Sequence, residues 1–120
     1  MPTLPSHLAR GHAAEELAIR HLKQHGLAIV QRNFRTRRGE IDIVARDGTT
    51  LVFVEVRLRG SAAFGGAAAS ITARKRARLL AAANEYLARH RSPPPCRFDA
   101  VLLDGLDERC VEWLRNVLES

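Results

Sequence analysis

Cysteines, aromatic residues and long apolar runs are all scarce in this chain of 120 residues. Cys96 and Cys110 are its two cysteines, and they do not form a CxxC pair, so neither a zinc ribbon nor a disulfide-stapled fold is predicted. Aromatic residues make up only 5% of the chain, which argues against a broad base-stacking surface. No segment approaches the roughly 18 consecutive apolar residues of a membrane helix, and the N-terminus has no apolar signal segment. We therefore expect a cytoplasmic protein that does not span a membrane.

Basic residues, in contrast, are plentiful. Lys and Arg number 19 against 13 Asp and Glu, which gives a formal net charge of +6. Such an excess favours a polyanionic partner such as nucleic acid, although a basic surface that is merely solvated has the same composition. With 46% hydrophobic residues, the chain can form one packed core. We expect a flexible N-terminus over residues 1–9 and a single domain over residues 10–120.

The apolar pattern predicts an α/β domain with the element order α-β-β-β-α-β. Helical spacing predicts helices over residues 10–25 and 71–91, and strand-like runs cover residues 27–36, 40–46, 51–59 and 97–103. The last of these strands follows a helix and is almost continuously apolar, which is typical of a buried strand parallel to an earlier one. Residues 110–118 fit either a short strand or a helix. The prediction is a mixed sheet of four or five strands flanked by helices.

Residues 39–59 carry most of the chemistry, because this predicted β-hairpin holds acids among its valines and isoleucines. Asp47 and Gly48 form a strong two-residue turn signal. Side chains alternate between the two faces of a strand, so Asp42 and Glu55 would share one face. The two-residue turn predicts these cross-strand pairs: Arg46 with Thr49, Asp42 with Phe53, and Glu40 with Glu55. The two acids would then be diagonal neighbours, and a four-residue loop would also keep them on one face, whereas a three-residue loop would separate them.

Two neighbouring carboxylates require a counter-cation. A divalent ion such as Mg²⁺ or Mn²⁺, held by Asp42, Glu55, a backbone carbonyl and water, would satisfy them. Arg57 shares the face of Glu55 and could hold a phosphate group. This arrangement suits metal-dependent hydrolysis of phosphodiester bonds. The alternative is a surface sheet face crossed by salt bridges, for example between Glu40 and Arg57.

The same residues carry a family resemblance. Asp42, then Glu55, then a basic residue two positions further resembles the motif of the PD-(D/E)XK nuclease superfamily. The chain as a whole resembles the YraN family of bacterial proteins, predicted endonucleases distantly related to Holliday-junction resolvases. The matching segments are Gly11, Glu15 and Ala18, residues 31–35, 39–42, 53–57 and 64–66, Lys75, and residues 97–99. The resemblance implies a restriction-endonuclease-like α/β core.

Metal ligands also follow from the resemblance. It implies that Asp42 and Glu55 bind the metal, that the Val56 carbonyl helps, and that Glu15 on the first helix completes the site. The helical spacing agrees, because it places Glu15 on the shoulder of the apolar stripe that faces the rest of the fold. Glu40 is expected to be a structural partner of an arginine rather than a ligand.

The identity of the catalytic cation stays open between Arg57 and Lys75. Arg57 stands where the superfamily motif has lysine, and an arginine can orient a phosphate but cannot act as a base. Lys75, on the second helix, is the other cation that the resemblance matches. The helical spacing favours it less than Arg76, which lies nearer the centre of the predicted buried stripe. That stripe consists of Leu79, Leu80, Ala83, Tyr86 and Leu87.

Three functions remain open. The first is a Mg²⁺- or Mn²⁺-dependent endonuclease acting on DNA, such as branched or damaged DNA, with a possible dimer only by analogy to resolvases. The second is a non-catalytic nucleic-acid-binding module on the same fold. The third is a protein-interaction subunit that uses its acidic tail and the Ala-rich residues 62–69. In the first two, the nucleic-acid contacts are assigned to Arg35, Arg37, Arg38, Arg59, Arg74 and Arg76.

Overall fold

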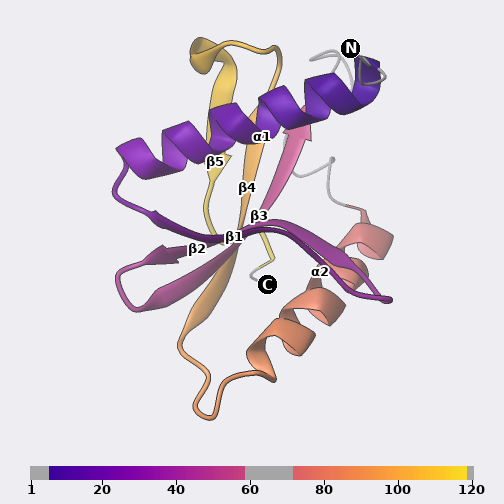
Figure 1. The fold of residues 1–120 in the computed structure, drawn as a ribbon, viewed down its shortest axis with the longest axis vertical. Coiled ribbons are helices and arrows are strands. Elements are labelled where there is room, and N and C mark those ends of the chain that lie inside the picture. Colours follow the sequence, from indigo (N-terminus) through magenta and orange to yellow (C-terminus); the bar gives the residue numbers. More distant parts are fainter. Residues whose placement is uncertain (1–5, 59–71, 119–120) are drawn as a thin grey trace, which may run out of the picture.

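A mixed five-stranded sheet with one helix on each face forms the protein, as the sequence predicts (Figure 1). The computed structural model describes residues 6–58 and 72–118, with side chains from residue 11 onward. The elements are α1 (Ser6–Gln24), β1 (Ala28–Arg35), β2 (Glu40–Asp47), β3 (Thr50–Leu58), α2 (Ala73–Leu87), β4 (Cys96–Leu103), the 3₁₀ turn η3 (Glu108–Cys110) and β5 (Val111–Leu114). The helix predicted from residue 10 begins earlier, at Ser6. Residues 1–5 of the predicted flexible N-terminus and the Ala-rich residues 62–69 lie outside the described part.

The strands follow one another across the sheet in the order β1-β2-β3-β4-β5. β1, β2 and β3 are antiparallel neighbours, and β4 is parallel to β3, which confirms the expectation for residues 97–103. The ambiguous residues 110–118 contain a strand, β5, antiparallel to β4. Among the described residues, no helix is both long and apolar enough to cross a membrane.

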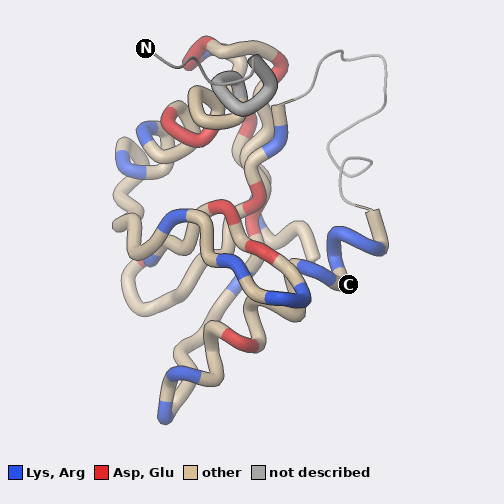
Figure 2. Tube along the Cα trace, turned by 45° about the vertical axis from the view of Figure 1, so that its right-hand side comes forward, with Lys and Arg blue, Asp and Glu red and all other residues tan. Residues whose placement is uncertain are grey.

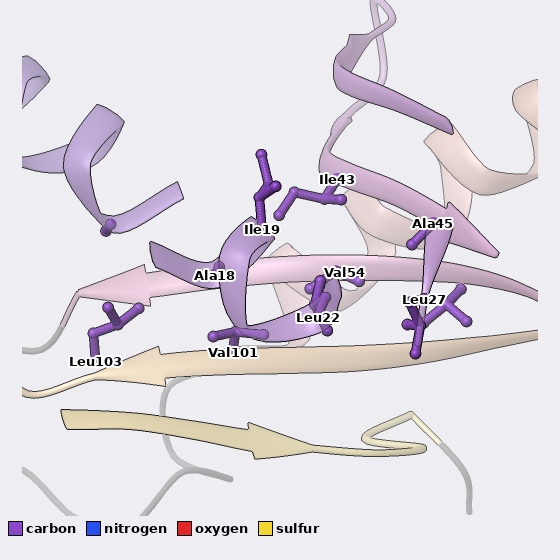
Figure 3. Close-up of a cluster of buried hydrophobic side chains, with 11 residues drawn as sticks. Ala18, Ile19, Leu22, Leu27, Ile43, Ala45, Val54, Val101 and Leu103 are labelled. Carbon is purple, nitrogen blue, oxygen red and sulfur yellow. The ribbon is translucent and has the colours of Figure 1, made fainter. Parts of the chain in front are cut away.

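Each helix covers its own hydrophobic core. α1 packs Ala14, Ala18 and Leu22 onto side chains such as Ile43 and Val54 on one face of the sheet (Figure 3). On the other face, α2 packs against a second set: Phe34, Ile41, Val44, Leu51 and Phe53. The alternation of side chains along β3 explains this division, since Val52 and Val54 point toward α1 while Leu51 and Phe53 point toward α2.

The turn between β2 and β3 is shifted relative to the prediction. Asp47 pairs with Thr50, and Arg46 pairs with Leu51 rather than Thr49. The two turn residues are therefore Gly48 and Thr49, and only Gly48 has a positive φ, of 63°. Glycine at the first central position is typical of a type II′ turn, which competes with the Asp-Gly type I′ turn that the sequence suggested.

This shift also changes the predicted pairs of the acids. Val44, not Asp42, is opposite Phe53, and the β2–β3 ladder ends with Ile43 opposite Val54. Continuing the same register by one residue places Asp42 level with Glu55. The predicted pairing of Glu40 with Glu55 is thus wrong. Since the slip is two residues, both acids keep the face that was predicted for them.

The β1–β2 hairpin contacts α2 through its tip. A Cβ atom on Gly39 would lie 1.9 Å from the carbonyl oxygen of Arg78, so only glycine permits this contact between two backbones. The tip itself is held by Thr36, whose hydroxyl accepts hydrogen bonds from the N–H groups of Arg38 and Gly39. The contact fixes the basic hairpin beside the first half of α2.

The buried face of α2 differs from the predicted stripe at one position, and this decides which basic residue faces the sheet. Leu80 is exposed, and Ala82 is buried in its place. The stripe therefore runs through Leu79, Ala82, Ala83 and Tyr86. Its extension toward the N-terminus reaches Lys75, which is half-buried, whereas Arg76 is exposed. The preference of the helical spacing for Arg76 was wrong.

Candidate metal and nucleic-acid site

Asp42 lies where β2 and β3 separate. Its Oδ2 atom accepts a hydrogen bond of 2.8 Å from the backbone N–H of Val56, just beyond the last β2–β3 pair. The side chain of Asp42 thus takes the place of the β2 backbone carbonyl that would accept this hydrogen bond from β3 in a regular ladder. The N–H and C=O groups of one strand residue point to the same side, so the Val56 carbonyl also faces this opening. The structure therefore brings together Asp42, Glu55 and the Val56 backbone.

Burial controls the protonation of the acid pair. Desolvation, followed by the neighbouring charge of Asp42, raises the pKa of Glu55 to about 8, and a hydrogen bond from the protonated Glu55 carboxyl to Asp42 adds to the shift. Burial also raises the pKa of Asp42, against the opposing hydrogen bond from Val56. The charge of Arg57 lowers the pKa of both acids, which places Arg57 close to the pair. The metal-free site therefore retains a proton near neutral pH.

Glu15 approaches the pair from α1. Burial raises the pKa of Glu15, and the charge of Asp42 raises it further, which shows that the two carboxylates are near each other. One of its oxygens, Oε1, is buried without a hydrogen-bond partner. The neighbouring Asn33 side chain has a smaller, opposite effect and lowers the pKa of Glu15. The position on the shoulder of α1 that the sequence predicts for Glu15 is the observed one.

In their observed positions, these groups form only part of a binding site for a divalent cation. Among the side chains of residues 11–58 and 72–118, no three His, Cys, Asp or Glu groups form a ready-made metal site. Mg²⁺, however, is commonly held by one or two carboxylates and keeps several waters. Asp42, Glu55 and the Val56 carbonyl supply that minimum, and Glu15, whose Oε1 has no hydrogen-bond partner, is a further carboxylate near Asp42. The donor set, all oxygen, is of the kind that Mg²⁺ and Mn²⁺ prefer.

Lys75 approaches the Asp42–Glu55 pair from α2, on the face of the sheet opposite α1. Its Nζ atom lies 3.7 Å from Oε1 of Glu55, and Thr72 caps α2 by accepting a hydrogen bond from the Lys75 backbone N–H. Arg76 instead points away and donates a hydrogen bond to the carbonyl of Leu118. Lys75 and Arg57 thus both lie beside the acids.

Basic side chains surround this cluster. Figure 2 shows Lys and Arg on the β1–β2 hairpin and along the first turns of α2. Arg35, Arg37, Arg38, Arg74 and Arg76 are all exposed, while Arg59 lies outside the described residues. Arg35 also lies 3.6 Å from Glu40, which agrees with the expectation that Glu40 is the partner of an arginine. The Gly39 contact holds the tip of the hairpin against α2, so the two sets of arginines belong to neighbouring elements.

Asn33 was not proposed as a site residue from the sequence. It lies near enough to Glu15 to lower its pKa, and it has a φ of 52°, which is unusual inside a strand. Asparagine tolerates this conformation better than most residues, and that preference was the only available signal. A single asparagine in a strand-like run is too weak a pattern to predict such a backbone.

Stability of the metal-free protein should fall as the pH rises. Folding raises the pKa of Glu55 from 4.5 to about 8. Between these pH values, the folded state therefore binds one more proton at Glu55 than the unfolded state does. Its contribution is complete below pH 4.5 and is lost as the pH rises through about 8. We expect the melting temperature in EDTA to drop by several degrees between pH 5 and pH 8. Thermal unfolding at several pH values measures this.

The matched variants for that measurement are Glu55→Gln and Glu85→Gln. Glutamine at position 55 cannot titrate, so the drop in melting temperature should become smaller. Glu85 is exposed on α2, and its replacement should leave the pH profile of the wild type intact. A Glu55→Gln profile identical to that of the wild type would contradict the assignment.

Comparisons with known proteins match almost the whole chain. The model of a family described as "Uncharacterised protein family UPF0102" matches residues 14–103. A UPF0102 protein of Nitrosomonas europaea is 51% identical over 111 residues, covering 92% of this chain and 94% of the relative. A UPF0102 protein of Dechloromonas aromatica is 52% identical over 112 residues, covering 93% and 90%. One of Albidiferax ferrireducens is 53% identical over 116 residues, covering 92% and 87%.

Proposed function

This chain belongs to protein family UPF0102, the YraN family that its motifs resembled, and on that premise we propose that it is a Mg²⁺- or Mn²⁺-dependent endonuclease acting on DNA. The observation that carries the proposal is the acid pair at the opening between β2 and β3. Burial holds a proton on Glu55 beside Asp42. Ionising both buried carboxylates is costly unless a cation takes that proton's place.

Each side chain of the cluster has a task in the proposed reaction. Asp42, Glu55 and the Val56 carbonyl hold the cation, and Glu15 completes its surroundings from α1. The bound cation would lower the pKa of a water molecule and offset the charge of the scissile phosphate. Arg57 remains charged and binds a non-bridging phosphate oxygen. Lys75 lies next to Glu55 and, unlike Arg57, can act as a base when its amine is neutral, so we assign it the lysine role of the superfamily motif.

The basic surface supplies the affinity for DNA. Arg35, Arg37 and Arg38 on the hairpin, with Arg74 and Arg76 on α2, would neutralise backbone phosphates on either side of the acids. Such contacts do not depend on base sequence, and they weaken as the salt concentration rises. Arg59 follows β3 in the sequence and is assigned to the same set.

A non-catalytic nucleic-acid-binding module is the second candidate. The observation in its favour is Arg57, which occupies the motif position of the lysine but cannot act as a base. This alternative predicts DNA binding that survives the loss of Asp42, or becomes tighter, because a negative charge has been removed from the surface.

Cleavage and binding assays separate the two candidates. The wild type and the double variant Asp42→Ala/Glu55→Ala are incubated with four-way-junction, nicked and single-stranded DNA in Mg²⁺ or Mn²⁺, and binding is measured across salt concentrations. We expect cleavage of at least one substrate by the wild type and a loss of about 1,000-fold or more in the double variant. Absence of cleavage by the wild type, or equal cleavage by both proteins, would overturn the endonuclease; salt-sensitive binding by both would then favour the module.

A further inference from the structure

A small pocket lies between α2, the start of β4 and the segment that follows β5. It has a volume of about 240 Å³, and its walls are formed by Leu80, Cys96, Arg97, Phe98, Asn116 and Leu118. Arg76 braces one wall, because its guanidinium donates a hydrogen bond of 3.0 Å to the carbonyl of Leu118. Pockets for drug-sized molecules typically have volumes of about 300–1,000 Å³, so this pocket suits a single ring system.

The pocket lies on the same face of the sheet as Glu55. Phe98 packs against the core beneath α2, and Ala100, two residues further along β4, pairs with Glu55. Two residues of a strand span about 7 Å. On α2, Lys75 lies 3.7 Å from Glu55, while the next residue, Arg76, reaches the wall of the pocket. A nucleic-acid strand bound at the acids would therefore pass the pocket.

Arg97 is the charged residue of the pocket, and its charge is already balanced. Its Nε atom donates to Asp99 and its Nη1 atom donates to Asp47, but Nη2 is buried and has no partner among the described residues. A phosphate group in the pocket would be repelled by these two carboxylates. A neutral acceptor, such as a carbonyl oxygen or a ring nitrogen, would satisfy Nη2 without that repulsion.

The other walls have the chemistry of a nucleobase site. Phe98 supplies a half-buried aromatic ring, and Leu80, which is 40% exposed, supplies apolar surface. The exposed Asn116 carries a side-chain amide that can both donate and accept hydrogen bonds. A nucleobase has a flat π-face and an edge of donors and acceptors, so it matches both kinds of wall.

We propose that this pocket binds one unpaired nucleobase of a nucleic-acid strand whose phosphate lies at the Asp42–Glu55 pair. The ring packs on Phe98 and Leu80, and its polar edge bonds the Asn116 amide and Nη2 of Arg97. The choice of a nucleic acid as ligand rests on the proposed function. A base that is paired within a duplex cannot reach such a pocket, so the site favours DNA with unpaired bases.

Two oligomers that differ only in their bases test the proposal. Oligothymidine and an abasic oligomer of the same length carry the same phosphates, and their affinities are measured in EDTA, which prevents metal-dependent cleavage. We expect the wild type to bind oligothymidine at least about tenfold more tightly, since stacking of a base on an aromatic side chain has an effect of this size.

The matched variants for this assay are Asn116→Gly and Asn84→Ala. Glycine accepts the φ of 56° at position 116 and keeps the backbone N–H that bonds Asp99, but it lacks the amide. Asn116→Gly should therefore reduce the affinity ratio of the two oligomers about threefold or more. Asn84 is exposed on α2 and is not part of the pocket, so Asn84→Ala should leave the ratio unchanged.

The two cysteines show where the base binds. Cys96 is exposed and lines the pocket, whereas Cys110 precedes Val111, which pairs with Leu103 at the other end of β4. At a concentration about ten times its Kd, oligothymidine should slow the reaction of Cys96 with N-ethylmaleimide about tenfold. The reaction of Cys110 should not change, and the abasic oligomer should protect neither cysteine.

The outcomes separate the pocket from catalysis. Equal affinity for both oligomers would overturn the proposal, and so would tighter binding of oligothymidine without protection of Cys96; neither result bears on cleavage. Protection of Cys96 in a protein that cleaves no DNA would support the pocket, and the endonuclease is then what fails. Absence of binding to either oligomer would overturn both the pocket and the nucleic-acid partner.

Discussion

Replacing Lys75 by methionine should lower the rate of DNA cleavage by about 100-fold or more, with little change in DNA affinity. Methionine keeps most of the side-chain length but removes both the charge and the proton-accepting nitrogen. Lys75 lies 3.7 Å from Glu55 and is only a third exposed, so it faces the acids rather than the solvent. Single-turnover cleavage at saturating protein separates the chemical step from binding.

Conservative variants distinguish a base from a simple charge. Lys75→Arg keeps the charge but cannot accept a proton, so it should remain nearly as slow as Lys75→Met. Arg57→Lys keeps the charge near the phosphate and should lose much less activity. The opposite order, with Arg57→Lys severely impaired and Lys75→Arg active, would assign the essential cation to Arg57.

The acid pair shows what the sequence could predict. Side chains alternate on any strand, so Asp42 and Glu55 share a face in every even register, and the observed slip of two residues preserved that result. The register itself was wrong because the turn chemistry was ambiguous. Asp47-Gly48 and Gly48-Thr49 are both acceptable two-residue turns, and packing of β3 between two cores selects the second.

Lys75 and Asn33 show what the sequence could not predict. A helical wheel averages all apolar residues, so counting Leu80 in the stripe moved its centre toward Arg76. Only the placement of α2 against β2 and β3 shows that Leu80 is exposed. In the same way, the left-handed backbone at Asn33 depends on the two cores that pull Ile41 and Ile43 to opposite faces. Local patterns do not contain that tertiary constraint.

Asp99 is the centre of a buried hydrogen-bond network that includes Arg97. It is 1% exposed and accepts two hydrogen bonds from Nε of Arg97, at 3.1 and 3.2 Å, one from the Trp113 indole at 3.0 Å and one from the Asn116 N–H at 3.1 Å. Arg97 also bonds Asp47 at 3.0 Å, beside the β2–β3 turn. One buried carboxylate thus connects β4, β5 and the segment after it, and through Arg97 the end of β2.

Asp99→Ala should therefore destabilise the protein by about 3–5 kcal/mol, because it leaves Arg97 short of a buried partner and two N–H donors without acceptors. For a chain of this size, that corresponds to a loss of roughly 10–20 °C in melting temperature. Glu108→Ala removes an exposed ion pair with Arg20 and should cost less than about 1 kcal/mol. The double variant Arg97→Met/Asp99→Leu should be more stable than Asp99→Ala, since it leaves no buried charge unpaired. Thermal and urea unfolding of the four proteins decide the matter: an Asp99→Ala protein as stable as Glu108→Ala would show that the network does not hold the sheet together.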